Sequence, residues 1–374
     1  MPSSSVAIAT IVDHRMWTHA AVLVQQLVDL ETRLPIVVFN LTAFPWHAVR
    51  LIRALGGRVA SLEPAMPVPA SFGSPLLPRP FIRDGAPVLG RVSPWAKLAV
   101  WGQTAWEKVV LLDVDVVLLR NIDEMAAFPA DTFSPETCNS MDPKRCSEAP
   151  QQVTTGFNAG VLVAGPSEER FSSMAEFATG RISELIRAAS DKAAALEVER
   201  LWLHYPEQSF LKQYWPAVMN ATIVGGGSTR AGYEWQPDTS GAGREWGHGW
   251  RTLRDRRACV RAAGTGPCVP PASHWMSRLY NARPYDCHTC SERYNAQVRI
   301  VHYTCGIKPW NRPMGAWQYC AEAPGNRSCK HHQPCTARWT LRWHVAHQRV
   351  CARAAAVGAA EAAGCAVSKG GARR

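Results

Sequence analysis

The sequence lacks a long hydrophobic run. No apolar stretch reaches the roughly 18–20 residues that a membrane-spanning helix needs, so we expect no membrane span in the chain as given. Residues 1–12, MPSSSVAIATIV, have no basic segment before their apolar run and do not resemble a signal peptide. The sequence leaves open whether an N-terminal anchor is missing. No internal repeat is present either.

Dense basic clusters are also scarce. The formal net charge of +11 favours anionic partners such as phosphates, but the basic residues are scattered. Residues 251–257, RTLRDRR, are the only dense cluster, and no nucleic-acid-binding signature is present. With 47% apolar and 19% charged residues, the 374-residue chain has the composition of a globular protein. We therefore expect an anion-binding enzyme that does not bind nucleic acid.

Cysteine is absent before Cys138 and abundant afterwards. Ten of the twelve cysteines lie from Cys259 to Cys365. An even number of cysteines in irregular sequence predicts a disulfide framework and an oxidising compartment. Three Asn-x-Ser/Thr triplets agree with that compartment. We expect a Golgi or secretory-lumen location, with the cytoplasm as the alternative because no signal or anchor is visible.

Zinc binding is the alternative use of these cysteines. Cys287-His-Thr-Cys290 is a typical first half of a zinc site. The remaining ligands would come from Cys320, Cys329, His331, His332 and Cys335. The spacing after the first pair is too irregular for a zinc finger, so disulfides that staple a long loop and tail are the preferred interpretation. The alternative predicts a zinc-organised interaction protein.

Strands and helices alternate in the first 120 residues. Apolar runs at 6–12, 34–40 and 58–62 predict strands, and residues 18–30 and 46–56 have the apolar spacing of helices. This alternation predicts an α/β fold in which a parallel sheet has helices on both faces. In such sheets, ligands bind beyond the carboxyl ends of the strands.

Two regions of the chain depart from this alternation. Residues 221–300 have no clean periodicity, and we predict a long insertion at about 217–278. After residue 315 come a cysteine-rich segment, a helix around 337–363 and a basic tail. We therefore expect a main domain at 1–315 and a C-terminal extension at 316–374.

An apolar segment with two carboxylates is the first candidate for chemistry. Residues 109–123, VVLLDVDVVLLRNID, suggest a buried strand that contains Asp113 and Asp115. Residues i and i+2 of a strand face the same side, so both carboxylates could bind one cation at its carboxyl end. Oxygen ligands suit Mg²⁺ or Mn²⁺. We predict that the strand ends near Leu112 and that the aspartates line a metal site. The alternative is a pair of solvated turn aspartates.

Four motifs in one order point to a known family. They are SPWAKLAVWGQTAWEKVVLLDVDVVLLRNIDEM (93–125), GFNAGVLVAGPS (156–167), YPEQSFL (205–211) and VHYTCGIKPW (301–310). Together they resemble glycosyltransferase family 8, the glycogenin-like retaining transferases of GT-A fold. The resemblance spans roughly residues 6–312. It implies a Rossmann-like nucleotide-sugar-binding domain with a mainly parallel mixed sheet.

The resemblance also implies roles for individual residues. The metal ligands would be Asp113, Asp115 and His302. The donor would be bound by Thr10, Ile11, Asp13, Trp17, Lys97, Asp113, Val114 and Gly306. The catalytic group would comprise Asn158, Glu207, Gln208 and Lys308, with Lys308 neutralising a diphosphate oxygen and Asn158 bonding the donor sugar.

The implied activity is a metal-dependent retaining transfer. With Mn²⁺ or Mg²⁺ as cofactor, a hexosyl or pentosyl group would move from a nucleotide sugar, with UDP as the expected nucleotide, to a glycan, protein or small-molecule acceptor. The resemblance leaves a homodimer open. Two departures, His204 and Glu207 at positions where the family often has aspartates, keep an alternative open. This alternative is a catalytically inert relative that serves as a sugar-binding or scaffold protein.

Overall fold

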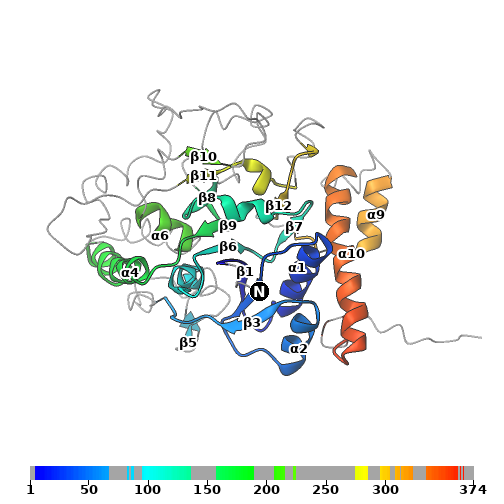
Figure 1. Ribbon diagram of the computed structural model, residues 1–374, viewed down its shortest axis with the longest axis horizontal. Helices are drawn as coiled ribbons and strands as arrows, with labels where there is room; N and C mark the ends of the chain where they lie inside the picture. Colours follow the sequence, from blue (N-terminus) through cyan, green and yellow to red (C-terminus); the bar gives the residue numbers. More distant parts are fainter. Residues whose placement is uncertain are drawn as a thin grey trace, which may run out of the picture.

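A computed structural model gives the fold of most of the regular elements (Figure 1). The described residues are 5–66, 82–83, 86–87, 95–135, 157–188, 206–214, 222–224, 274–284, 295–303, 308–311, 313–322, 334–360, 363 and 365. Gly306, His204, Cys305, Cys287 and Cys290 therefore lie outside them.

The centre of the molecule is an eight-stranded mixed sheet with the order β10-β11-β8-β9-β6-β1-β2-β3. The strands of its parallel half are β1 (Val6–Val12), β2 (Ile36–Asn40), β3 (Arg58–Ser61) and β6 (Lys108–Leu112). Those of the other half are β8 (Thr132–Pro135), β9 (Phe157–Ala164), β10 (Thr222–Val224) and β11 (His274–Met276). Strand β9 runs antiparallel to both of its neighbours. The prediction of an α/β fold with a mainly parallel mixed sheet is confirmed.

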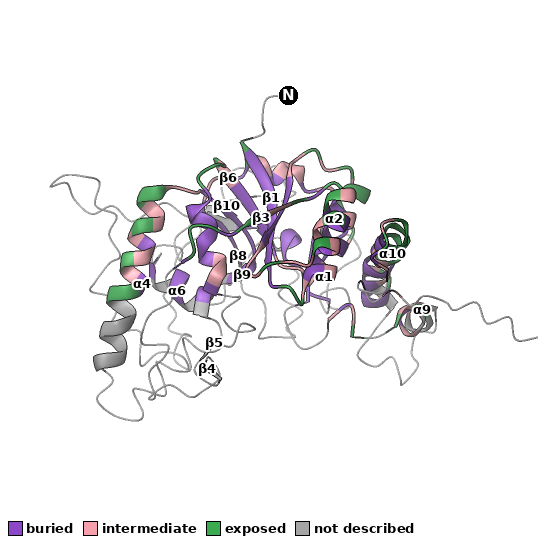
Figure 2. Cartoon of the chain, turned by 90° about the horizontal axis from the view of Figure 1, so that it is seen from below, coloured by how far each residue is buried: buried purple, intermediate pink, exposed green. Residues whose placement is uncertain are grey.

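Helices cover both faces of this sheet (Figures 1 and 2). Alternate residues of β1 enter two separate cores, because successive strand side chains point to opposite faces. Ile8 packs toward α1 (Trp17–Asp29) and α2 (Trp46–Ala54). Ala9 packs toward the 3-10 helix η2 (Lys97–Gly102) together with α4 and α6. The bounds of these last helices are α4 (Glu168–Ala188) and α6 (Pro206–Tyr214).

A second, two-stranded sheet lies beyond the end of β6. The chain leaves the main sheet after Leu112 and resumes extended structure as β7 (Val116–Leu118). Strand β7 pairs antiparallel with β12 (Ile300–His302), with His302 opposite Val116. The predicted end of the strand near Leu112 is confirmed, and the turn between the two sheets carries both aspartates.

The C-terminal helices pack beside α1. Helix α10 (Pro334–Ala356) contacts α1 and β7, and α9 (Met314–Glu322) packs on its outer side (Figure 2). Trp343 and Val350 of α10 belong to the same hydrophobic core as α1. Helix α10 therefore continues the layer that covers one face of the sheet.

Both ends of the predicted insertion are strands of the main sheet. Strand β10 lies near its beginning and β11 near its end, and the two pair in parallel. Short pieces also appear as β4 (Ile82–Arg83) and β5 (Ala86–Pro87). None of the helices in the described part of the chain combines the length and apolar character needed to span a bilayer.

Candidate active site at the end of β6

The two aspartates lie where the main sheet gives way to the small sheet. The backbone N–H of Asp113 donates to the carbonyl of Gly160 on β9 at 2.8 Å, which extends the β6–β9 pairing by one residue. The carbonyl of Asp115 accepts from the backbone N–H of Tyr303 at 3.0 Å. The turn is therefore anchored to β9 on one side and to the residue after β12 on the other.

His302, at the end of β12, joins the aspartates. Its Nε2 lies 3.1 Å from Oδ1 of Asp115 and 3.8 Å from Oδ2 of Asp113. The side chain of His302 is only 3% exposed. The structure thus brings together the three residues predicted as metal ligands, and their ligand atoms all lie within 4.8 Å of one another.

This group fits a divalent cation in two ways. Oδ1 of Asp115 is buried, and Nε2 of His302 faces it at 3.1 Å without a well-directed hydrogen bond. The absence of a side chain at Gly160 lets the imidazole come this close: a Cβ at this position would lie 2.0 Å from Cε1 of His302 and 2.8 Å from Oδ2 of Asp113. Two carboxylates and an imidazole at such distances suit Mn²⁺ or Mg²⁺.

Lys97 connects the aspartates to Glu207. Its Nζ lies 2.7 Å from the carboxylate of Asp113 and 3.8 Å from Oε1 of Glu207. Lys97 is the first residue of η2 and Glu207 lies in the first turn of α6, so two helices on one face of the sheet position this pair. Oε2 of Glu207 is buried and has no hydrogen-bond partner.

Lys308 contacts the other aspartate, Asp115. Its Nζ pairs with Oδ2 of Asp115 and also donates to the carbonyl of Tyr303. The side chain of Lys308 is 28% exposed, against 13% for Lys97. Lys308 is therefore the more accessible of the two cations.

Burial and pairing act in opposite directions on the ionisable groups. Burial raises the pKa of Asp115, but His302 and Lys308 outweigh burial and hold it well below its usual range. Burial lowers the pKa of Lys97, but Asp113 and then Glu207 outweigh this and raise it overall. Burial raises the pKa of Glu207 because its pairing with Lys97 at 3.8 Å is too distant to compensate fully.

Four of the residues predicted to bind the donor lie at the end of the neighbouring strand, β1. Thr10 and Ile11 are buried near the carboxyl end of β1, and Asp13 and Trp17 are buried just beyond it. Continuing the β1–β6 register brings Ile11 level with Asp113. Oγ1 of Thr10 is buried without a partner. The carboxylate of Asp13 accepts hydrogen bonds from the backbone and the guanidinium of Arg15.

The remaining predicted residues lie around the aspartates. Asn158 is buried on β9, where its Oδ1 accepts from the backbone N–H of Gly160 at 2.8 Å. Gln208 is buried beside Glu207 and hydrogen-bonds to it. Val114, between the two aspartates, packs against the hydrophobic core.

The sequence did not identify two residues that shape this site. Gly160 leaves room for the imidazole of His302. Asn281 accepts at its Oδ1 from Nδ1 of His302 at 2.9 Å. Gly160 lies inside a quoted motif and is the glycine of a strand interior, which is a known signal of close approach. Asn281 lies in the part of the sequence that has no clean periodicity, so no pattern marks it.

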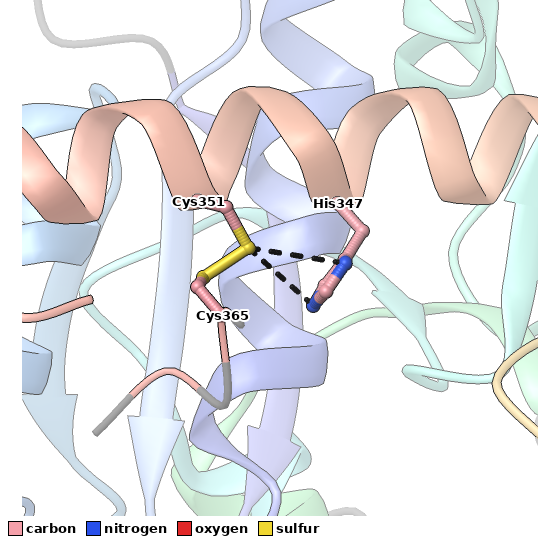
Figure 3. A group of neighbouring side chains, drawn as sticks. All are labelled: His347, Cys351 and Cys365. Atoms are coloured by element: carbon pink, nitrogen blue, oxygen red, sulfur yellow. Dashed lines mark hydrogen bonds between the residues drawn. A yellow bond between two sulfur atoms is a disulfide. The ribbon is translucent and has the colours of Figure 1, made fainter. Parts of the chain in front are cut away.

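A second group of potential metal ligands lies in the C-terminal half of α10 and just after this helix (Figure 3). His347, Cys351 and Cys365 also have ligand atoms within 4.8 Å of one another. However, Cys351 and Cys365 form a disulfide, and the His347 ring nitrogens lie 3.9 and 4.0 Å from Sγ of Cys351. Because metal binding at cysteine needs the thiolate, this group is a structural staple. It provides one disulfide of the predicted framework.

The arrangement defines an α/β protein with an acidic, histidine-containing site that lies between two lysines, at the carboxyl ends of its strands.

No protein-family model matches this chain. A putative UDP-glucuronate:xylan alpha-glucuronosyltransferase 3 of Arabidopsis thaliana is 26% identical over 138 residues, covering 36% of this chain and 19% of that protein. Inositol phosphorylceramide glucuronosyltransferase 1 is 22% identical over 234 residues (60% and 31%), and galactinol synthase 5 is 25% identical over 173 residues (40% and 48%), both from the same plant.

These relatives bear out the predicted resemblance to glycosyltransferase family 8. The chain spans less than half the length of each of them. Among solved structures, the galactosyltransferase LgtC with donor and acceptor sugar analogues is 13% identical, with a TM-score of 0.43 and coverage of 92% of this chain and 95% of that one.

Proposed function

We propose that this chain is a metal-dependent, retaining glycosyltransferase. It transfers a hexosyl or pentosyl group from a UDP-sugar to a glycan, protein or small-molecule acceptor. The observation that carries the proposal is the buried Asp113–Asp115–His302 group with its unpartnered carboxylate oxygen. The names of the curated relatives, which include UDP-glucuronate transferases, support a UDP-sugar donor.

The charges around the aspartates explain how a nucleotide diphosphate would be bound. Lys97 and Lys308 face three carboxylates, those of Asp113, Asp115 and Glu207, so the ionised group is net negative when His302 is neutral. With a divalent cation held by Asp113, Asp115 and His302, this net charge changes sign, and Lewis-acid stabilisation of the leaving diphosphate becomes available. Lys308 is exposed enough to exchange Asp115 for a diphosphate oxygen.

The donor sugar would lie against Glu207. Oε2 of Glu207 is a buried acceptor without a partner, and an unsatisfied buried acceptor of this kind costs about 1–3 kcal/mol. A sugar hydroxyl would satisfy it. Gln208 hydrogen-bonds to Glu207, and Asn158 accepts from the backbone N–H of Gly160; both would orient the same ring. Lys97 keeps Glu207 and Asp113 in place through its two contacts.

The disulfide supports a location in an oxidising compartment. Cys351 and Cys365 are paired, and disulfides persist in the secretory pathway but are rare in the cytosol. We therefore place the enzyme in the secretory lumen, where its acceptor would also be found.

Hydrolysis of nucleotide sugars tests the proposal directly. A panel that includes UDP-glucuronate, UDP-galactose and UDP-glucose should show Mn²⁺-dependent release of UDP from at least one donor. Asp115→Asn, which removes a charged ligand while keeping its shape, should lower this turnover at least about hundredfold at the Mn²⁺ concentration that saturates the parent. Turnover within twofold of the parent would contradict the assignment, and the absence of turnover with every donor would favour a catalytically inert protein.

A further inference from the structure

Nε2 of His302 can bind a cation only when its lone pair is not occupied by a proton. In the neutral imidazole one ring nitrogen carries the proton and the other is the acceptor, so the tautomer decides whether Nε2 is a ligand. The group that hydrogen-bonds to Nδ1 sets this choice. In this chain, that group is Asn281.

The contact between Asn281 and His302 is short and buried. Oδ1 of Asn281 lies 2.9 Å from Nδ1 of His302, and the two residues are 1% and 3% exposed. Water therefore does not compete for Nδ1. An amide oxygen only accepts, so Nδ1 carries a proton, and Nε2 is the nitrogen that remains to face a cation with its lone pair.

The backbone fixes Asn281 relative to His302 on both sides. The N–H of Ala282 donates to the carbonyl of Ile300 at 3.0 Å, and the N–H of His302 donates to the carbonyl of Ala282 at 2.7 Å. One residue earlier, the N–H of Arg299 donates to the carbonyl of Leu279 at 2.8 Å. Residues 279–282 thus run along β12 in a fixed register, and Asn281 cannot move away from the imidazole without breaking these bonds.

The opposite nitrogen faces the aspartates. Nε2 lies 3.1 Å from Oδ1 of Asp115, and the imidazole helps to lower the pKa of that carboxyl. The ring also packs closely against the backbone of Gly160, since a Cβ there would lie 2.0 Å from Cε1 and 2.7 Å from Nε2. The imidazole is therefore held in one orientation with Nε2 toward the aspartates.

We propose that Asn281 is a positioning residue that keeps a proton on Nδ1 of His302, so that Nε2 is the nitrogen that presents a lone pair to a cation between Asp113 and Asp115. The importance of this role rests on the proposed metal-dependent function. The Nδ1–H bond to Asn281 itself does not, because the metal-free chain already makes it.

Three variants at two positions test the role. Asn281→Leu removes the acceptor and keeps a similar volume. Asn281→Asp keeps an acceptor but has no amide hydrogen to donate, so it also reports which end of the amide faces Nδ1. Asn121→Leu is the matched control: it removes an asparagine that bonds the carbonyl of Leu30 at 2.8 Å, away from the site. Melting temperatures compare the structural cost of the three changes.

The first measurement is the ¹⁵N spectrum of the histidine rings in metal-free protein. We expect a protonated, hydrogen-bonded Nδ1 of His302 in the parent, in Asn281→Asp and in Asn121→Leu, and the loss of this hydrogen-bonded proton in Asn281→Leu. The second measurement is Mn²⁺ binding followed by electron paramagnetic resonance. We expect Asn281→Leu to weaken it about 10–100-fold and Asn281→Asp to stay within about threefold of the parent.

Two results would overturn the proposal. One is an Nδ1 of His302 that carries no proton in the parent. The other is a loss of Mn²⁺ affinity in Asn281→Asp as large as that in Asn281→Leu, which would mean that the amide donates to Nδ1. If the parent binds no Mn²⁺ at all but shows the hydrogen-bonded Nδ1 proton that Asn281→Leu abolishes, the proposed function fails while the role of Asn281 stands.

Discussion

The described residues include two groups of three potential metal ligands, one at the ends of β6 and β12 and one in the second half of α10 and just after it. In the Asp113–Asp115–His302 group and in the His347–Cys351–Cys365 group, the ligand atoms come within the same 4.8 Å. In the first group the ligands are joined by ion pairs of His302 with the two aspartates, which a cation can replace. In the second group a covalent bond already joins the two sulfur atoms.

The surroundings of the two groups differ in the same sense. Two lysines flank the carboxylates, and Gly160 leaves space beside them. The ring of His347 instead stacks on Trp343 at 5.2 Å between centroids, within the packing of α10. Proximity of ligand atoms is thus not sufficient for a metal site, which also needs deprotonated ligands and space for the ion.

Filling the space beside His302 should have the largest effect. Gly160→Ala would place a methyl group 2.0 Å from Cε1 of His302, so the ring must move away from the aspartates. We expect donor turnover to fall at least about hundredfold and Mn²⁺ affinity about 10–100-fold, as for lost support of a metal ligand.

Gly180→Ala is the matched control for this change. Gly180 lies in α4 and a Cβ there has nothing within 4 Å, so we expect parental turnover and a slight gain in stability from helix propensity. Parental Mn²⁺ affinity in Gly160→Ala would mean that the space beside His302 has no part in ion binding.

Removing the charge of Glu207 should have the next largest effect. Glu207→Gln keeps the shape of the side chain, and we expect kcat to fall about tenfold or more with a smaller rise in KM, because an interaction with the sugar ring grows toward the transition state. Steady-state kinetics of donor hydrolysis measure both constants.

Glu124→Gln controls for the loss of a paired carboxylate. Glu124 pairs with Arg299 at 3.3 Å away from the site, so its loss should leave kcat unchanged. A Glu207→Gln variant with parental kcat and a slightly lower melting temperature would reduce Glu207 to a helix-start carboxylate that interacts with the helix dipole.

Opening the disulfide should affect stability and leave the chemistry intact. The double change Cys351→Ser and Cys365→Ser removes a cross-link with a sequence separation of 14, for which the chain-entropy model gives about 3 kcal/mol. Denaturant unfolding measures this loss. We expect kcat and Mn²⁺ affinity within twofold of the parent, and a matching loss of Mn²⁺ affinity would place the second group in the metal site.

Acid should weaken the packing of α10 through His344. Burial, and secondly the nearby His347, lowers the pKa of His344 from 6.5 to about 4. His344 therefore becomes protonated at about pH 6.5 in the unfolded chain but only at about pH 4 in the folded chain. The free energy of unfolding falls as the pH drops through this window. We expect a contribution of about 1–2 kcal/mol between pH 7 and pH 5.

His344→Gln tests this contribution. Unfolding free energies of the variant and the parent, compared at pH 7 and pH 5, should show a smaller pH dependence in the variant. Equal pH dependence in the two proteins would show that His344 is not the group responsible.

Patterns in the sequence predicted the parallel half of the fold well. Strand β1 matches the expected run 6–12, and the strand that precedes the aspartates ends at Leu112 as expected. Continuous apolar runs mark buried parallel strands, and a charged pair marks their end. Strands β10 and β11 were not predicted, because they are three residues each inside sequence without periodicity.

The candidate site was predicted where a motif gives local spacing, and was missed where it depends on tertiary contacts. Lys97, His302 and Lys308 were named through the family resemblance, and the structure brings them to the aspartates. The roles of Asn281 and Gly160 depend on tertiary contacts with the imidazole of His302, which no local pattern in the sequence marks. The pairing of Cys351 with Cys365 could not be predicted either, because connectivity does not follow from cysteine positions.

The central claim is that the first group binds a divalent cation and the second does not. A Mn²⁺ titration followed by electron paramagnetic resonance, with disulfides intact, compares the parent with Asp115→Asn and with the double serine variant. The account predicts one saturable site in the parent and in the double serine variant, and none in Asp115→Asn. A saturable site that survives Asp115→Asn, or no saturable site in the parent, would contradict it.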